Sequence, residues 1–146
     1  MFQVETSTVI NRPIEEVFAV LSNVENNPKW VSIFQEATKT SPGPIGVGTT
    51  WHFMLKALGQ RIEGDVEVVE YEANRTYVQK SNAGPVPVEI RQTCAPVAGG
   101  TEVNFTLKAE PGSFFKLAEP LVKSFGQRSI EKDLAKLKDL MEAHAL

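Results

Sequence analysis

Side chains that can act as acids, bases, nucleophiles or metal ligands are few in this sequence. The histidines are His52 and His144, and the single cysteine is Cys94. Two isolated histidines lack the spacing of a metal site, so we expect no bound metal. His52 follows Trp51 on a predicted strand and should point away from it, as an exposed or satisfied residue; the alternative is a general base or pocket donor. The pattern around Cys94 indicates a small buried apolar residue rather than a nucleophile.

Neutral polar side chains on predicted strands are the other candidates for chemistry. Gln92 shares one strand face with Val88 and Ile90, so its amide is predicted to point inward. Thr106 alternates with Phe105 and is predicted to point outward. No acid, base and nucleophile come together in this pattern, which leaves open whether the protein catalyses any reaction.

Large apolar side chains on the predicted inner faces favour a binding cavity instead. Aromatic rings there would stack on a flat ligand, although each ring also fits ordinary core packing. Gly64 leaves space at the sheet, for a bend or for a ligand. The predicted cavity residues are Trp30, Phe34, Trp51, Phe53, Ile62, Gly64, Val66, Val88, Ile90, Phe105, Phe114, Leu117, Leu121 and Phe125.

These side chains must be positioned by strands separated by short turns. Apolar alternation predicts a first strand over Phe2–Ile10, and helical spacing from Ile14 to Leu21 predicts a helix opened by Pro13. A second short helix is expected from about Val24 to Trp30. Six further strands are predicted, and the short gaps between them indicate antiparallel hairpins: Phe34–Lys39, Thr49–Lys56, Arg61–Tyr71, Thr76–Ser81, Val86–Cys94 and Thr101–Ala109.

The C-terminal segment has helical spacing in two stripes that do not share a phase. One stripe is Phe114, Leu117, Leu121 and Phe125, and the other is Ile130, Leu134, Leu137 and Met141. We expect a break near Pro120 or Gly126 that lets Phe125 face the cavity. Without a break, Gln127 replaces Phe125 there. Lys132, Asp133, Lys136 and Asp139 are assigned to the polar face. Helices at both ends of a run of strands indicate the α+β class.

Composition restricts the function classes. The chain has 146 residues and a formal net charge of −3, which fits one domain over residues 1–146 and gives no electrostatic reason to bind nucleic acid. We expect a cytoplasmic protein, because the sequence has one cysteine and no signal-peptide pattern. We expect no integral membrane segment, because no apolar run approaches ~18 residues. The expected state is a monomer or homodimer. No helix is predicted after the glycine-rich run Gly43–Gly48, so it is not read as a phosphate loop, and we expect no cofactor.

Several stretches, in this order and spacing, resemble one protein family. They are Ser7–Phe18, Asn27–Trp30, Gly46–Thr49, Gly99–Val103 and Ser129–Lys138. They are similar to the START-like (SRPBCC) superfamily, in its bacterial polyketide cyclase/dehydrase-like branch. The resemblance implies a helix-grip fold: a curved seven-stranded antiparallel sheet wrapped around a long C-terminal helix, with two short helices between the first two strands. It also implies a cavity for small hydrophobic or aromatic molecules.

Three functions follow as hypotheses. The first is binding of a small hydrophobic or aromatic ligand, for transport or sequestration. The second is a cyclase/dehydrase-type enzyme acting on an aromatic or polyketide-like substrate, for which the resemblance implies a cavity arginine; Arg91 is predicted to point outward with Glu89, which departs from that expectation. The third is a toxin–antitoxin or stress-related interaction protein.

Overall fold

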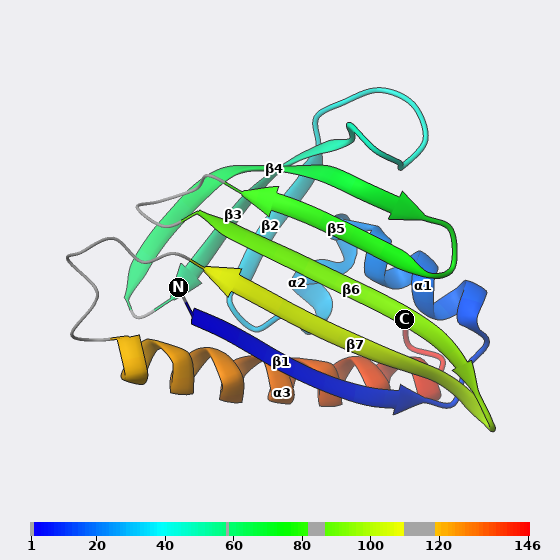
Figure 1. Ribbon diagram of the computed structural model, residues 1–146. Coiled ribbons are helices and arrows are strands. Elements are labelled where there is room, and N and C mark those ends of the chain that lie inside the picture. The colour runs from blue at the N-terminus through cyan, green and yellow to red at the C-terminus, as the bar shows by residue number, and fades with distance from the viewer. Residues whose placement is uncertain (1, 58, 82–86, 110–118) are drawn as a thin grey trace.

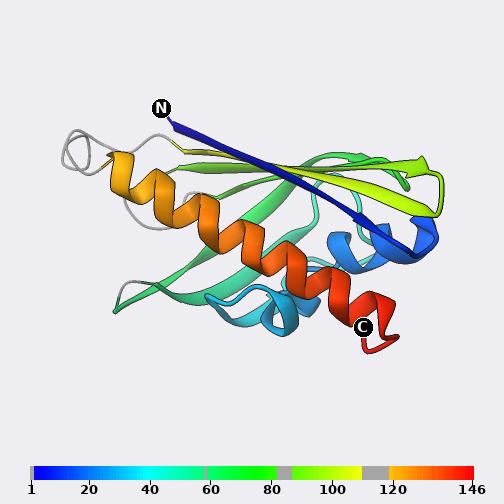
Figure 2. The same cartoon turned by 90° about the horizontal axis from the view of Figure 1, so that it is seen from below.

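A long helix packs against a curved antiparallel sheet in the computed structural model, which describes residues 2–57, 59–81, 87–109 and 119–146 (Figures 1 and 2). The helix, α3 (Glu119–Glu142), runs beneath the sheet alongside its first strand. The strands are β1 (Phe2–Ile10), β2 (Phe34–Lys39), β3 (Thr50–Ala57), β4 (Gln60–Glu72), β5 (Thr76–Ser81), β6 (Val88–Val97) and β7 (Gly100–Ala109).

The strand order is β1-β7-β6-β5-β4-β3-β2, and every neighbouring pair is antiparallel. Strands β2 to β7 therefore form a meander, and β1 joins it by pairing with β7. Between β1 and β2 lie α1 (Ile14–Ser22), a 3-10 turn η1 (Val24–Asn26) and α2 (Asn27–Trp30). This arrangement confirms the predicted α+β helix-grip fold, with strand bounds close to those expected from alternation and turns.

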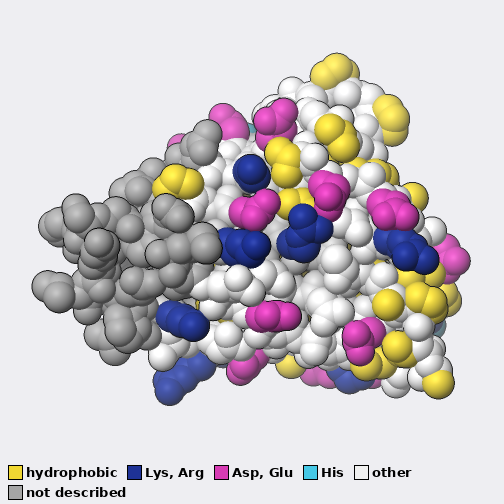
Figure 3. All heavy atoms as spheres, viewed as in Figure 1, with side chains coloured by type: hydrophobic (Ala, Val, Ile, Leu, Met, Phe, Trp, Pro, Cys, Tyr) yellow, Lys and Arg dark blue, Asp and Glu magenta, His cyan; other side chains and the backbone are white. Residues whose placement is uncertain are grey.

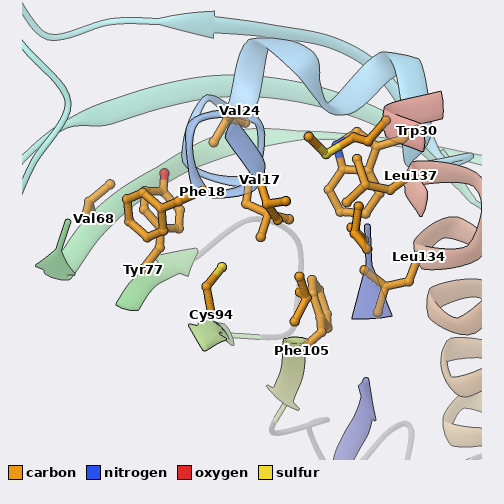
Figure 4. Close-up of a cluster of buried hydrophobic side chains, with 14 of the residues drawn as sticks. Val17, Phe18, Val24, Trp30, Val68, Tyr77, Cys94, Phe105, Leu134 and Leu137 are labelled. Atoms are coloured by element: carbon orange, nitrogen blue, oxygen red, sulfur yellow. The ribbon is translucent and has the colours of Figure 1, made fainter. Parts of the chain in front are cut away.

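The fully packed core lies where α1, α2 and the C-terminal half of α3 meet the sheet. Val17 of α1, Trp30 of α2 and Leu137 of α3 are all buried together, and Tyr77 of β5 belongs to the same cluster (Figure 4). Side chains from three helices and several strands thus fill this part of the interior. Burial of that apolar area is the main favourable term that holds the helices on the sheet.

Helix α3 is continuous, which corrects the expected break near Gly126. Its buried stripe includes Leu134, Leu137 and Met141, and a Cβ added at Gly126 would meet the side chain of Val4 at 3.6 Å. That distance is an ordinary van der Waals contact, so the helix passes beside β1 at Gly126 without a break. Pro120 is the second residue of α3, a position where its missing N–H costs no hydrogen bond.

Polar contacts fix the C-terminal end of α3 to the end of β1. The side chain of Lys138 donates to the Val9 carbonyl at 2.6 Å, and the Asn11 amide donates to the Glu142 carboxylate at 2.9 Å. These contacts hold the pKa of Glu142 below its ordinary value, chiefly through Lys138. The Arg12 guanidinium lies 2.9 Å from the ring of His144. This end of the helix is therefore attached to the sheet by charged groups as well as by apolar packing.

The turn after β1 also packs tightly against the β6–β7 hairpin, and Gly100 permits this approach. A Cβ at Gly100 would overlap the Ile10 carbonyl oxygen and lie 2.9 Å from the Asn11 Cα. Both contacts are backbone atoms, which cannot move aside as the end of a flexible side chain does.

We predict that Gly100→Ala lowers the free energy of unfolding by about 2 kcal/mol, because the added methyl group forces β1 and β7 apart. Urea unfolding monitored by circular dichroism measures this. Gly46→Ala is the control, since its added Cβ meets no atom within 4 Å. Equal stability of the two variants would contradict the close approach described for Gly100.

Candidate functional site

The inner face of the sheet carries most of the predicted cavity residues. Trp51, Phe53 and Leu55 of β3 lie opposite Val66, Gly64 and Ile62 of β4 in the register, so all six share one face. The Phe53 ring is 5.8 Å from that of Phe34 on β2, centre to centre. Val88 and Ile90 of β6, with Phe105 of β7, lie on the same face. The alternation in the sequence therefore predicted the facing of these strands.

Packing on this inner face differs between the two ends of the sheet. At the end near α1 and the C-terminus of α3, Trp51 and Tyr77 are fully buried. Toward the end where α3 begins, the inner-face residues Ile62, Ile90 and Leu107 are only partly buried. Apolar side chains that face inward and yet keep some exposure indicate incomplete cover of the sheet in this region. This partly covered inner surface is our candidate functional site.

Two buried glutamines lie at the border between the packed and the partly covered regions. Gln79 of β5 and Gln92 of β6 are 6% and 5% exposed, and the side-chain oxygen of each has no hydrogen-bond partner. Gln92 lies opposite Tyr77, and Gln79 lies opposite Ile90, so both amides are on the inner face. The inward facing predicted for Gln92 is confirmed. Gln79 was missed, although alternation through Thr76–Ser81 places it beside Tyr77 on that face.

The other polar groups in this region are neutral and poor acids. The Trp51 indole N–H donates to the Tyr77 hydroxyl at 3.2 Å, and burial raises the pKa of Tyr77 far above its ordinary value. Burial also raises the pKa of the Cys94 thiol to about 11. The thiolate of Cys94 is therefore rare at neutral pH, which agrees with the structural role predicted for this residue.

The remaining candidates for catalysis point outward. His52 lies 3.1 Å from the Asp65 carboxylate on the exposed face, and the Arg91 guanidinium donates to Glu70 at 2.7 Å there. Thr106 lies opposite Arg91, on the same outer face. The predictions for all three are confirmed. No cluster of three or more potential metal ligands occurs among the residues that the structure describes.

The residues after β7 that were predicted to line the cavity divide into two groups. Phe125 is 42% exposed and lies on the side of α3 opposite Leu134, so its predicted inward position is wrong. The phase set by Leu134 continues through Gly126 and leaves no break to turn Phe125 inward. Gln127 donates to the Glu5 carbonyl at 3.1 Å, beside β1. Phe114, Leu117 and the side chain of Leu121 lie outside the described residues.

Two surface depressions lie away from the inner face of the sheet. One, of about 430 Å³, is lined by Asn11, Arg12, Pro13, Ile14, Pro96, Gly99 and Gly100. The other, of about 360 Å³, is lined by Lys123, Ser124, Gln127, Arg128 and Glu131 on α3. Neither includes a residue of the predicted apolar wall.

Comparison with known proteins identifies the family. The sequence model described as "Polyketide cyclase / dehydrase and lipid transport" matches residues 1–142. The chain belongs to this family. Membership of the polyketide cyclase/dehydrase and lipid transport family confirms the resemblance seen in the sequence motifs, and it agrees with an apolar inner surface under the sheet.

Solved structures share the fold at low sequence identity. The protein TTHA0849 of Thermus thermophilus superposes with a TM-score of 0.83 and 21% identity, covering 99% of this chain and 100% of that one. A START superfamily protein of Mycobacterium smegmatis gives a TM-score of 0.72 and 16% identity, over 98% and 96% of the two chains. These likenesses support the fold of this family member.

Curated relatives match over a shorter stretch. Uncharacterized proteins of Mycobacterium tuberculosis (strain H37Rv) and Mycobacterium bovis are each 34% identical to this chain over 58 residues. The match spans 40% of this chain and 33% of theirs.

A buried carboxylate lies beneath the sheet, close to α2. Asp133 of α3 is 5% exposed and accepts a hydrogen bond from the Ser32 amide at 3.2 Å. Its assignment to the polar face of the helix is therefore wrong. Burial raises its pKa above the ordinary value of 3.8, although the Ser32 hydrogen bonds and the nearby Lys136 and Lys132 oppose that shift.

We predict that Asp133→Asn raises the melting temperature at pH 7 by a few degrees. Because the folded state binds the Asp133 proton more tightly than the unfolded chain does, wild-type stability falls as pH rises from 3.8 through the raised folded pKa. An amide avoids this loss and still accepts from Ser32. Melting curves between pH 4 and pH 7 measure the effect. Asp139→Asn, exposed on the same helix, should leave that part of the profile unchanged; the same response in both variants would refute the role of burial.

Proposed function

We propose that this protein binds a small hydrophobic or aromatic ligand between α3 and the inner face of the sheet. The observation that carries the proposal is the set of inward apolar side chains that stay partly exposed where α3 begins, including Ile62, Ile90 and Leu107. A ligand that covers them removes apolar surface from water, which is the general driving force for such binding. The family, described by lipid transport as well as cyclase chemistry, supports the same conclusion.

Binding without catalysis fits the inner face better than the cyclase/dehydrase alternative. That enzyme needs a group to stabilise developing negative charge or to move a proton. Arg91 and His52 both lie on the outer face, paired with Glu70 and Asp65. Of the candidates His52, Gln92 and Thr106, Gln92 alone faces inward, and an amide is neither an acid nor a base at physiological pH.

The interaction-protein alternative needs a continuous apolar surface patch. The exposed large hydrophobic residues that the structure describes are scattered over different elements: Val9, Val47, Val69, Val97 and Phe125. Charged side chains of both signs separate the apolar ones on the face shown in Figure 3. No described helix combines the length and apolarity needed to span a membrane. A cytoplasmic location, a monomeric or homodimeric state and the transport or sequestration role stay predictions.

We predict that the neutral fluorescent probe N-phenyl-1-naphthylamine binds the wild-type protein and that Ile90→Trp weakens this binding by about 10-fold or more. The larger side chain fills space on the inner face that the ligand needs. Fluorescence titration measures the affinity of both proteins.

Val97→Trp is the matched control, since Val97 lies on the same strand but is 37% exposed. It should bind the probe as the wild type does. Melting curves establish that both variants are folded. Probe binding that is unchanged in a folded Ile90→Trp variant would contradict a site on the inner face, and no binding to the wild type would refute the proposed function itself.

A further inference from the structure

Each of the two inward glutamines carries a cost, because its buried amide oxygen has no hydrogen-bond partner. Gln79 and Gln92 are both more than nine-tenths buried, and neither side-chain oxygen has a hydrogen-bond partner. Leaving such a group unsatisfied costs the desolvation energy of that group, so proteins seldom keep one without a purpose. Here two occur on neighbouring strands and face the same interior.

Their placement lets the two amides act together on one ligand group. Gln79 pairs with Ile90, and Gln92 is two residues further along that face of β6, so the glutamines are diagonal neighbours about 7–8 Å apart. Each side chain is long enough to reach a single atom between them. The partly buried Ile90 lies next to both, which connects the amides to the apolar surface of the candidate site.

The surrounding charges favour a neutral partner. The inner faces of β1 and β3–β7 carry no charged side chain at any position that the structure describes. On β2, Lys39 lies opposite Trp51, and its ammonium group donates to the carbonyls of Ser41 and Gly43. The charged residue buried beneath the sheet, Asp133, is acidic and would repel an anion. Bringing a carboxylate into such a region without a cation would cost far more than two amide hydrogen bonds return.

We propose that Gln79 and Gln92 form a polar subsite that recognises a hydroxyl group on an otherwise apolar ligand. A hydroxyl group both donates and accepts, so it donates to one amide oxygen and accepts from the other amide after that side chain rotates. This inference rests on the proposed function, because it assumes that an apolar molecule occupies the inner face. It adds the chemical class of that molecule: neutral and hydroxylated, such as a phenol or an alcohol, rather than a fatty acid anion.

The test uses three probes of nearly equal size: 2-naphthol, 2-methylnaphthalene and 2-naphthoate. Each competes with N-phenyl-1-naphthylamine for the wild-type protein at pH 7. We expect 2-naphthol to bind about 10-fold more tightly than either of the others, as expected for a hydrogen bond made in a buried site. In Gln79→Met and Gln92→Met, which keep the side-chain length, the preference should fall to about twofold. Gln35→Met, exposed on β2, is the matched control and should keep the wild-type preference.

A second measurement separates recognition from a structural role. Since each Met variant removes a buried side-chain oxygen that has no hydrogen-bond partner, the ligand-free variants should melt at or above the wild-type temperature while they lose the preference for 2-naphthol. A preference that persists in both folded variants would overturn the inference, as would equal binding of 2-naphthol and 2-methylnaphthalene or tighter binding of 2-naphthoate. Those results leave the proposed function intact. Failure of all the probes to bind the wild type would instead refute the proposed function.

Discussion

The position of α3 along β1 determines how much of the sheet's inner face is covered. The helix is held near its C-terminus by Lys138 and Glu142, which bond to the backbone of Val9 and Asn11, and its glycine at position 126 lies against Val4. Both attachments are to the first strand and the turn after it, at one edge of the strand order. A helix fixed at this edge covers its near strands well and leaves part of the inner faces of β4 and β6 to other side chains or to a ligand.

The inner face of the sheet is covered differently at the two ends of the interior. Near α1 and α2, aromatic and aliphatic side chains fill the space, and the polar atoms of Trp51 and Tyr77 bond to each other. Two buried atoms of α2, Trp30 Nε1 and Asn27 Oδ1, have no hydrogen-bond partner. Toward the start of α3, the inward aliphatic residues keep some exposure. At the border between the two regions, the side-chain oxygens of Gln79 and Gln92 have no hydrogen-bond partner. A core built only for stability would bury these aliphatic residues fully and would hold apolar residues in place of Gln79 and Gln92. The combination therefore suggests a surface shaped for another molecule.

Local patterns in the sequence predicted the sheet well but predicted the helix less well. Alternation of apolar and polar residues correctly predicted that Gln92 faces inward and Arg91 outward, because side chains along a strand alternate between its two faces. The short turns show where each strand begins and ends. The inward position predicted for Phe125 was wrong because the segment has two apolar stripes. The sequence pattern alone does not show which of them packs against the sheet. Asp133 was assigned to the polar face because its partner, the Ser32 amide, lies 101 residues away in the chain and no local pattern connects them.

The same limits explain why the fold identifies a binding surface more readily than a reaction. A helix-grip sheet places many side chains on one concave face, and a single substitution there changes which ligand groups are satisfied without changing the fold. In this chain the strand positions that face inward hold aliphatic, aromatic and neutral polar side chains, while Arg91 and His52 face outward with acidic partners. Turning either residue inward would need a one-residue shift in register, which would also expose the aromatic residues of the core. The apolar core therefore holds the register, and the register keeps the charged groups out of the interior.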